Sequence, residues 1–231
     1  MSGRSFEKFA ELASKIIAVG KNYADHIKEM GYAATSATKK GEPLIFMKPT
    51  SAFVKEGSKI EIPPGCANLH HEVELGVVIG RLAKKVREEE AMQYVAGYTV
   101  ALDMTDRDLQ ATAKKNGTPW TIPKGFDTSC PVGSFIPKKA VPDPHALRIW
   151  CKVNGETRQD GTTSDMIFSI PFLISYITNY ITLYPGDVVL TGTPAGVSGV
   201  KEGDVIEAGI GDLSKVRFEV GTYEAPAQEN N

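Results

Sequence analysis

The most constraining feature of the sequence is an apolar, β-branched run over residues 70–80 that contains two glutamates two positions apart. This composition predicts a strand, in which successive side chains point to opposite faces. Glu72 and Glu74 then share one face, while Val73 and Leu75 share the other. Two carboxylates held a few ångströms apart resist ionising together unless a positive charge neutralises them. A bound divalent cation is the simplest neutralising group.

The glutamate pair also has a second interpretation, in which both side chains lie on the wet face of an antiparallel strand and bind nothing. A third carboxylate favours the metal site. Asp103 ends another apolar run, residues 95–102, where an unpaired acid would be costly to bury. Three carboxylates suit Mg²⁺ or Mn²⁺, whereas zinc would be expected to recruit cysteine or histidine. His70 has the same strand parity but ranks below the three acids as a ligand.

Composition limits the domain count and the partners. A chain of 231 residues with 42% hydrophobic content predicts one domain with a full core, and a net charge of −2 without a basic block predicts no nucleic-acid partner. The longest apolar stretch is interrupted by polar residues and proline, so we expect no membrane span. Three scattered cysteines predict neither disulfides nor a zinc cluster. We therefore expect a reducing intracellular compartment, either the mitochondrial matrix or the cytoplasm.

The pattern along the chain predicts a mostly β fold of the α+β class. Short β-branched runs predict strands over residues 16–19, 44–47, 52–54, 59–62, 147–153, 188–191 and 205–206. Helices are expected over residues 5–13, 22–30, 88–94, 105–115 and 170–181, the last capped by Ser169. Asn154-Gly155 predicts a tight hairpin with a return strand through Arg158. No regular βαβ alternation is present, which excludes a Rossmann or barrel fold.

A second constellation lies on the short helix after Asn22. His26 and Glu29 are three residues apart, so both side chains fall on one helix face. A carboxylate beside an imidazole raises its proton affinity and fixes its tautomer, as a water-activating base requires. Taken alone, the pair is more typical of a solvated surface helix than of a catalytic dyad.

Four motifs together resemble the fumarylacetoacetate hydrolase family, and most closely its single-domain acylpyruvase and oxaloacetate decarboxylase/tautomerase branch. They are GKNYADH at residues 20–26, HEVELG at 71–76, DMT at 103–105 and TGTPAG at 191–196. The resemblance extends from about residue 16 to residue 220, with the motifs in the family's order. Each motif is modest evidence, but the set is specific.

The resemblance implies a fold and a metal site. The fold is a mixed β-sandwich or roll of the family's C-terminal type, with a few short helices. It forms one catalytic domain over residues 1–231, with a core of about 16–220 and a lid of about 21–42. Glu72, Glu74 and Asp103 would bind Mg²⁺ or Mn²⁺. Residues 31–41 would belong to the moving lid, and the protein would be a homodimer.

The resemblance also implies roles for individual side chains. His26 and Glu29 would form a catalytic dyad, and Lys124 would be the catalytic lysine. Four residues would bind substrate: Lys48, Arg107, Gln110 and Thr193. Two features depart from close relatives. Lys21 replaces an arginine, so a bidentate grip on a carboxylate becomes a point-charge contact, and the lid loop is longer.

The resemblance therefore implies an enzyme that acts on small 2-oxo acids through a pyruvate enolate stabilised by the metal. Three reactions share that enolate: hydrolysis of a carbon-carbon bond in acylpyruvates, decarboxylation of oxaloacetate, and keto-enol tautomerisation of oxaloacetate. One alternative is a hydratase or isomerase of an aromatic-degradation pathway. Another is a non-catalytic metal-dependent module that binds oxo acids.

Overall fold

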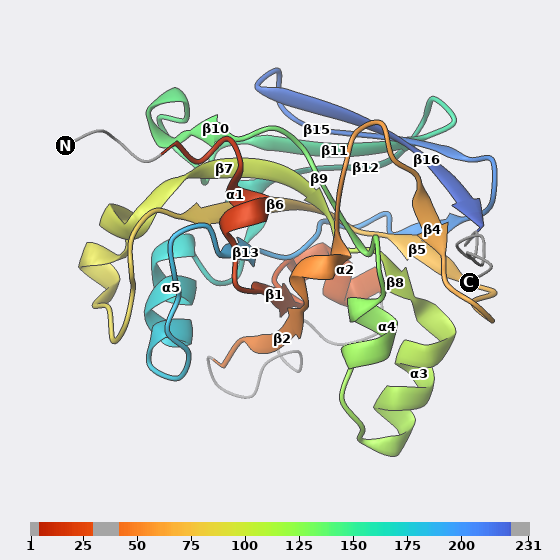
Figure 1. Ribbon diagram of the computed structural model, residues 1–231, viewed down its shortest axis with the longest axis horizontal. Helices are drawn as coiled ribbons and strands as arrows, with labels where there is room; N and C mark the ends of the chain where they lie inside the picture. Colours follow the sequence, from red (N-terminus) through yellow and green to blue (C-terminus); the bar gives the residue numbers. More distant parts are fainter. Residues whose placement is uncertain (1–4, 30–41, 223–231) are drawn as a thin grey trace, which may run out of the picture.

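The computed structural model describes residues 5–29 and 42–222 (Figure 1), so the predicted moving loop at residues 31–41 lies outside the described residues. Most of the chain forms three sheets. The largest has eight strands in the order β2-β1-β13-β6-β7-β9-β3, with β10 also paired to β7. Their bounds are β1 (Ile16–Gly20), β2 (Leu44–Lys48), β3 (Phe53–Lys55), β6 (Val73–Ile79), β7 (Val95–Leu102), β9 (Cys130–Val132), β10 (Ile136–Pro137) and β13 (Val188–Leu190).

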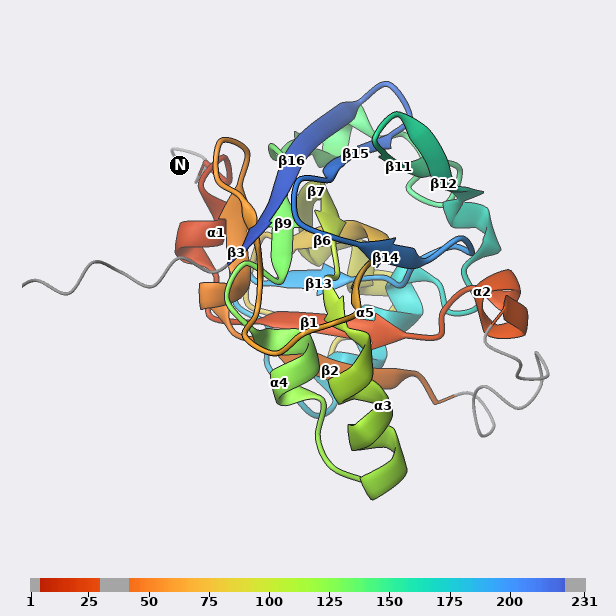
Figure 2. The same ribbon diagram turned by 90° about the vertical axis from the view of Figure 1, so that its right-hand side faces the viewer.

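Two smaller sheets complete the β structure. The five-stranded sheet has the order β12-β11-β15-β16-β4, and the three-stranded sheet has the order β14-β5-β8. Their bounds are β4 (Ile60–Ile62), β5 (Leu69–His71), β8 (Thr105–Asp106), β11 (Arg148–Val153), β12 (Glu156–Thr162), β14 (Ser198–Val200), β15 (Val205–Ile210) and β16 (Ser214–Thr222). Figure 2 shows β11, β12, β15 and β16 arching over β6 and β7. The mostly β class predicted from the sequence is confirmed.

The helices are short and lie around the sheets. They are α1 (Phe9–Leu12), α2 (Ala24–Glu29), α3 (Arg107–Asn116), α4 (Thr121–Gly125) and α5 (Ile170–Thr178). Short 3-10 segments are Thr50–Ala52, Glu88–Tyr94, Lys138–Ala140 and Thr163–Asp165. The predicted cap of α5 is confirmed, because the Ser169 hydroxyl accepts from the Phe172 N–H at 3.3 Å. The start predicted for α3 was wrong by two residues, because Thr105 and Asp106 pair with β5 instead.

The predicted hairpin is also confirmed. β11 and β12 pair antiparallel around Asn154 and Gly155, whose φ angles are 53° and 81°. The Asn154 side chain donates to Asp204 and accepts from the Val205 N–H, each at 2.9 Å. The turn therefore ties β11 and β12 to the beginning of β15.

The run of residues 70–80 differs from the single strand that its sequence predicts. It is divided into β5 and β6 at Glu72, and every residue of β6 is buried. Val73, Leu75 and Val77 belong to the larger apolar core, whereas Val78 packs in a second core. Both faces of β6 are therefore covered, and the interpretation of a wet glutamate face was wrong. The physical reason is the central position of β6 in a sheet that is packed on both sides.

Asp187 fastens the N-terminal segment to β13. Its carboxylate accepts from the Ser14 N–H at 2.7 Å, the Ser14 hydroxyl at 2.8 Å and the Tyr184 N–H at 2.8 Å, and it pairs with the Lys15 ammonium. Burial opposes its ionisation, but Lys15 and these donors outweigh that cost and lower the pKa of Asp187.

We expect Asp187→Asn to lower the free energy of unfolding by about 3 kcal/mol at pH 7, because hydrogen bonds to a charged group are lost in a buried site. Since the folded pKa is depressed, the difference from wild type should be largest above the pKa of an unfolded aspartate and should shrink as the pH falls. Urea unfolding at pH 7 and at pH 3 measures both effects. Asp160→Asn, which breaks an exposed pair with Arg148, is the control and should cost less than about 1 kcal/mol. Equal losses in the two variants would contradict the prediction.

Candidate active site

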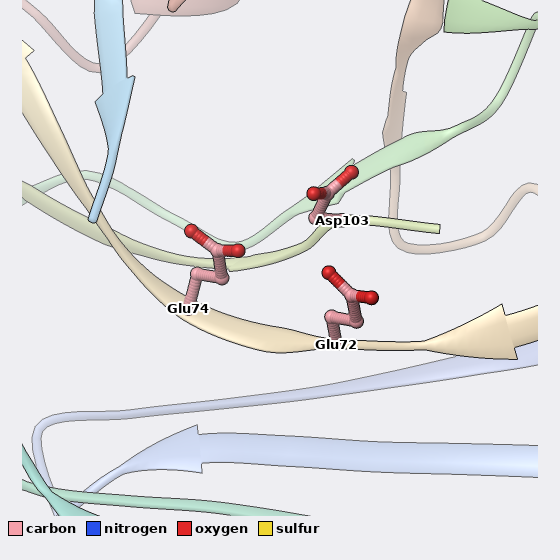
Figure 3. A group of neighbouring side chains, drawn as sticks. All are labelled: Glu72, Glu74 and Asp103. Carbon is pink, nitrogen blue, oxygen red and sulfur yellow. The ribbon is translucent and has the colours of Figure 1, made fainter. Parts of the chain in front are cut away.

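The three predicted carboxylates converge in the interior. Glu74 lies on β6, Glu72 directly precedes β6, and Asp103 directly follows β7. Because β6 and β7 are antiparallel neighbours with Val73 opposite Leu102, the start of one strand meets the end of the other. One oxygen from each carboxylate lies within 4.8 Å of one oxygen from each of the others, and all three residues are buried. Figure 3 shows Glu72 and Glu74 rising from the same face of the strand toward Asp103.

Two cations border the carboxylate group on the side of α3 and α4. The Lys124 ammonium, on α4, bridges Glu72 at 2.9 Å and Asp103 at 2.6 Å. Arg107, at the start of α3, donates to Glu72 at 2.7 Å and to the Gln110 side chain at 2.8 Å. Four side chains predicted to form the site thus belong to one hydrogen-bonded cluster with Asp103.

Lys48 provides a third cation beneath the carboxylates. Its ammonium is fully buried, lies 2.8 Å from Asp103, and donates to the backbone oxygens of Met104, Lys124 and Ser129. Three carbonyl acceptors take its three protons, so its interaction with Asp103 is an ion pair without an aligned hydrogen bond. Substrate binding by Lys48 stays a prediction, and the contacts described show it holding Asp103.

The charges of the cluster affect the three acids differently. Burial opposes the ionisation of Glu72, but Lys124 and Arg107 outweigh it and hold the pKa of Glu72 well below its usual value. Burial raises the pKa of Glu74 well above its usual value, and the charges of Asp103 and Glu72 raise it further. Without a cation, Glu74 therefore binds a proton more readily than an ordinary glutamate does, although the Gly192 N–H donates to it at 2.6 Å.

The donor set fits a divalent cation of the hard type. Three carboxylate oxygens at this mutual spacing can bind one Mg²⁺ or Mn²⁺ while leaving other positions for water and substrate. His70 is not part of this group. A cation would also relieve the repulsion that raises the pKa of Glu74. The residues present therefore fit the metal that the sequence predicts.

The predicted dyad faces the same cluster. His26, on α2, is buried and its Nδ1 lies 3.3 Å from the Glu29 carboxylate. Glu29 also accepts from the Gly196 N–H at 3.1 and 3.2 Å. Gly196 belongs to the predicted TGTPAG motif, so this contact connects α2 with the loop after β13.

A cleft connects His26 of the dyad with Glu72 of the carboxylate group. Its lining includes His26, Glu72, Arg107, Gln110 and Lys124, and it encloses about 30 Å³. A larger hollow of about 560 Å³ runs along the edge strand β2, where Lys48 is the single predicted site residue in its lining. We assign the site to the smaller cleft, because the ionisable groups converge there.

Thr193 lies behind the carboxylates and does not contribute to the lining of this cleft. It is buried, and its hydroxyl donates to the backbone oxygen of Val73 at 2.8 Å. Its predicted contact with substrate stays a prediction.

Two neighbours of Thr193, His71 and Gln159, were not identified from the sequence as functional. His71 Nδ1 lies 2.9 Å from the side-chain oxygen of Gln159. Burial lowers the pKa of His71 to about 4. His71 stands beside the glutamates in its motif, but no local signal points to Gln159.

Known proteins are similar to this chain in both fold and sequence. A family model described as fumarylacetoacetate (FAA) hydrolase C-terminal matches residues 15–221. The chain belongs to the fumarylacetoacetate hydrolase family. The family resemblance and the fold predicted from the sequence are thereby confirmed.

Two relatives that are more than 50% identical to this chain are named for one activity. The mitochondrial oxaloacetate tautomerase FAHD1 of Rattus norvegicus is 55% identical over 219 residues, which cover 95% of this chain and 97% of the relative. The Arabidopsis thaliana protein of the same name is 53% identical, with coverages of 95% and 96%.

A solved structure links the fold to a metal and an oxo acid. Fumarylpyruvate hydrolase from Pseudomonas aeruginosa, in complex with Mn²⁺ and pyruvate, is 37% identical with a TM-score of 0.85, covering 91% of each chain. The 5-carboxymethyl-2-hydroxymuconate delta-isomerase of Mycobacterium smegmatis is 37% identical with a TM-score of 0.80, covering 93% of this chain and 81% of that one. In residues 5–29 and 42–222, no helix has the length and apolarity needed to cross a membrane.

Proposed function

We propose that this family member is a Mg²⁺- or Mn²⁺-dependent enzyme that acts on small 2-oxo acids, with oxaloacetate as the preferred substrate and tautomerisation as its main reaction. The observation that carries the proposal is the buried cluster of Glu72, Glu74 and Asp103 beside a cleft lined by cationic side chains and His26. The oxaloacetate tautomerases that are 53% to 55% identical support the choice of substrate.

The balance of charge favours a dicarboxylate. With all three acids ionised, as metal binding requires, their charges are matched by Lys48, Lys124 and Arg107. A divalent cation then adds two positive charges to a largely buried site, whose cleft is also lined by Lys21 and Lys114. Oxaloacetate brings two negative charges, whereas an acylpyruvate such as acetylpyruvate brings one. Neutralisation in a poorly solvated site therefore favours the dianion.

The chain's own residues position the substrate and move protons. A divalent cation bound by the three carboxylates would supply Lewis acidity for the carboxylate and 2-oxo oxygens of the substrate. Arg107, Gln110 and Lys124 line the cleft and can donate hydrogen bonds to substrate oxygens. The cleft encloses about 30 Å³, which is less than a four-carbon acid fills. We propose that α2 moves, because it carries His26 and is attached to the TGTPAG loop through Glu29.

His26 would act differently in the three reactions. In tautomerisation, it would exchange a proton with C3 of oxaloacetate while the enol oxygen exchanges another. In acylpyruvate hydrolysis, it would take a proton from water, and the resulting hydroxide would attack the distal carbonyl before the carbon-carbon bond breaks. Decarboxylation releases CO₂ without attack by water. The dyad is therefore essential for hydrolysis and less so for decarboxylation.

The test measures metal-dependent tautomerisation, CO₂ release from oxaloacetate and acetylpyruvate hydrolysis as separate reactions. We expect turnover that EDTA abolishes, with the highest kcat/KM for oxaloacetate. In His26→Ala, hydrolysis should fall by about 10²- to 10⁴-fold, the usual contribution of a general base, while decarboxylation should fall by less than about tenfold. Free metal without protein is the control for uncatalysed enolisation. Turnover that persists in EDTA, or no turnover of any substrate above the control, would refute the proposal.

A second candidate function is that of an isomerase in the breakdown of aromatic compounds. The likeness to the muconate isomerase favours it, and turnover of an unsaturated 2-hydroxy diacid in the same assay would identify it. A binding module without turnover is less compatible with the site, because binding alone does not need His26 held next to Glu29.

The proposal also covers the cellular compartment and the oligomeric state. The relatives' names support a mitochondrial address, which cell fractionation can test against the cytoplasm. The resemblance supports a homodimer, for which sedimentation should give twice the monomer mass.

A further inference from the structure

Gln159, a buried glutamine on β12 of the five-stranded sheet, contacts β6, the strand that carries Glu74. Gln159 is fully buried, although its neighbours Arg158 and Asp160 are exposed. Burying a primary amide is costly unless both its oxygen and its nitrogen are hydrogen-bonded. Here each end has two partners, which lie on three other segments of the chain.

Two backbone groups determine which way the amide faces. The Val73 N–H can only donate, and it lies 3.0 Å from Oε1 of Gln159. The Pro194 carbonyl can only accept, and it lies 2.8 Å from Nε2. Oε1 therefore faces β6, and Nε2 faces the TGTPAG loop.

This orientation sets the proton positions of the neighbours. Since Oε1 accepts, His71 must carry its proton on Nδ1, which is 2.9 Å away. Since Nε2 donates to the Thr193 hydroxyl at 2.7 Å, that hydroxyl gives its own proton to the Val73 carbonyl at 2.8 Å. His71 Nε2 is then free to accept from the Ser198 hydroxyl at 2.9 Å.

These hydrogen bonds fix both backbone groups of Val73, the residue between the proposed metal ligands Glu72 and Glu74. Gln159 holds the N–H of Val73 directly and holds its carbonyl through Thr193. The loop also packs closely on β12, since a Cβ on Gly196 would lie 1.9 Å from the backbone oxygen of Arg158. Through Gly192, the same loop donates to Glu74. Displacing Gln159 would therefore change the positions of Glu72, Glu74 and the TGTPAG loop relative to one another.

We propose that Gln159 is a positioning residue of the metal centre, which sets the geometry of Glu72 and Glu74 from the neighbouring sheet without touching metal or substrate. This inference rests on the proposed metal site. Groups that orient metal ligands typically contribute 10- to 100-fold to metal affinity.

Gln159→Met tests the proposal, because methionine has nearly the same length but cannot make these hydrogen bonds. We expect Mn²⁺, measured by calorimetry on the full chain, to bind at least about 10-fold more weakly. The matched control is Thr178→Val, which removes two hydrogen bonds from a buried hydroxyl on α5, away from the cleft. The control should lose thermal stability but bind Mn²⁺ as wild type does.

The outcomes separate positioning from general destabilisation. If Gln159→Met folds and binds Mn²⁺ like wild type, or if Thr178→Val loses as much affinity, the proposal is overturned. If Gln159→Met does not fold, Gln159→Glu replaces it: it keeps the acceptor for Val73 and loses the donor to Thr193 and Pro194. Its added negative charge would by itself attract Mn²⁺, so weaker binding supports positioning and unchanged or tighter binding refutes it. Mn²⁺ affinity does not depend on substrate, so failure of the proposed reaction remains a separate result.

Discussion

Glu74→Gln is expected to lose Mn²⁺ binding by more than about 100-fold and to lose metal-dependent turnover with it, while the metal-free protein remains at least as stable as wild type. The loss should exceed the 10- to 100-fold typical of residues that only orient ligands. Glutamine keeps an oxygen that can accept from the Gly192 N–H but cannot supply the anionic ligand.

The stability half of this prediction follows from the pKa of Glu74. Burial and the neighbouring acids raise it above the value in the unfolded chain, so the folded protein binds the extra proton and becomes less stable as the pH rises through this range. A neutral glutamine avoids that cost at pH 7. Calorimetric titration measures the Mn²⁺ affinity, and urea unfolding in EDTA measures the stability of the metal-free protein.

The control for Glu74→Gln is Glu219→Gln, on the exposed side of β16. It makes the same substitution without touching the cluster and should leave both measurements unchanged. Wild-type Mn²⁺ affinity in Glu74→Gln would remove Glu74 from the ligand set. A large loss of stability in EDTA would instead show that Glu74 is ionised and paired in the metal-free protein.

Lys124→Met is expected to destabilise the metal-free protein by about 3 to 5 kcal/mol, the usual cost of leaving buried charges without their partner. Its ammonium bridges Glu72 and Asp103, and a divalent cation can neutralise the same two carboxylates. Saturating Mn²⁺ should therefore restore much of the lost stability. Turnover should stay low, since Lys124 lines the cleft and we propose that it donates to the substrate. Thermal unfolding in EDTA and in Mn²⁺ measures this difference.

Lys115→Met, on the exposed side of α3, is the control for Lys124→Met and should respond to Mn²⁺ as wild type does. The distinguishing quantity is the rise in melting temperature on adding Mn²⁺, which should be larger in Lys124→Met than in wild type. Equal rises in all three proteins would mean that the ammonium and the cation do not share these carboxylates.

The local pattern of the chain determined the parts of the site that depend on one or two strands. The spacing of Glu72 and Glu74 placed them on one side of β6, and the end of an apolar run marked Asp103 as a buried acid. Asn154-Gly155 determined its hairpin for the same reason, because strand alternation and turn geometry are short-range properties. Helical spacing placed His26 and Glu29 on one face, and the family resemblance then favoured a catalytic role for them and for Lys124, which no spacing rule indicated.

Only the tertiary structure decided how the charges are compensated. Lys48 comes from β2 and Lys124 from α4, yet both ammonium groups contact Asp103. Gln159 lies on a strand whose other residues are mostly exposed, and its side chain bonds to a loop more than thirty residues away. The burial of both faces of β6 likewise depends on which sheet covers it. Contacts of this kind arise from packing between distant segments, so the periodicity within one segment does not predict them.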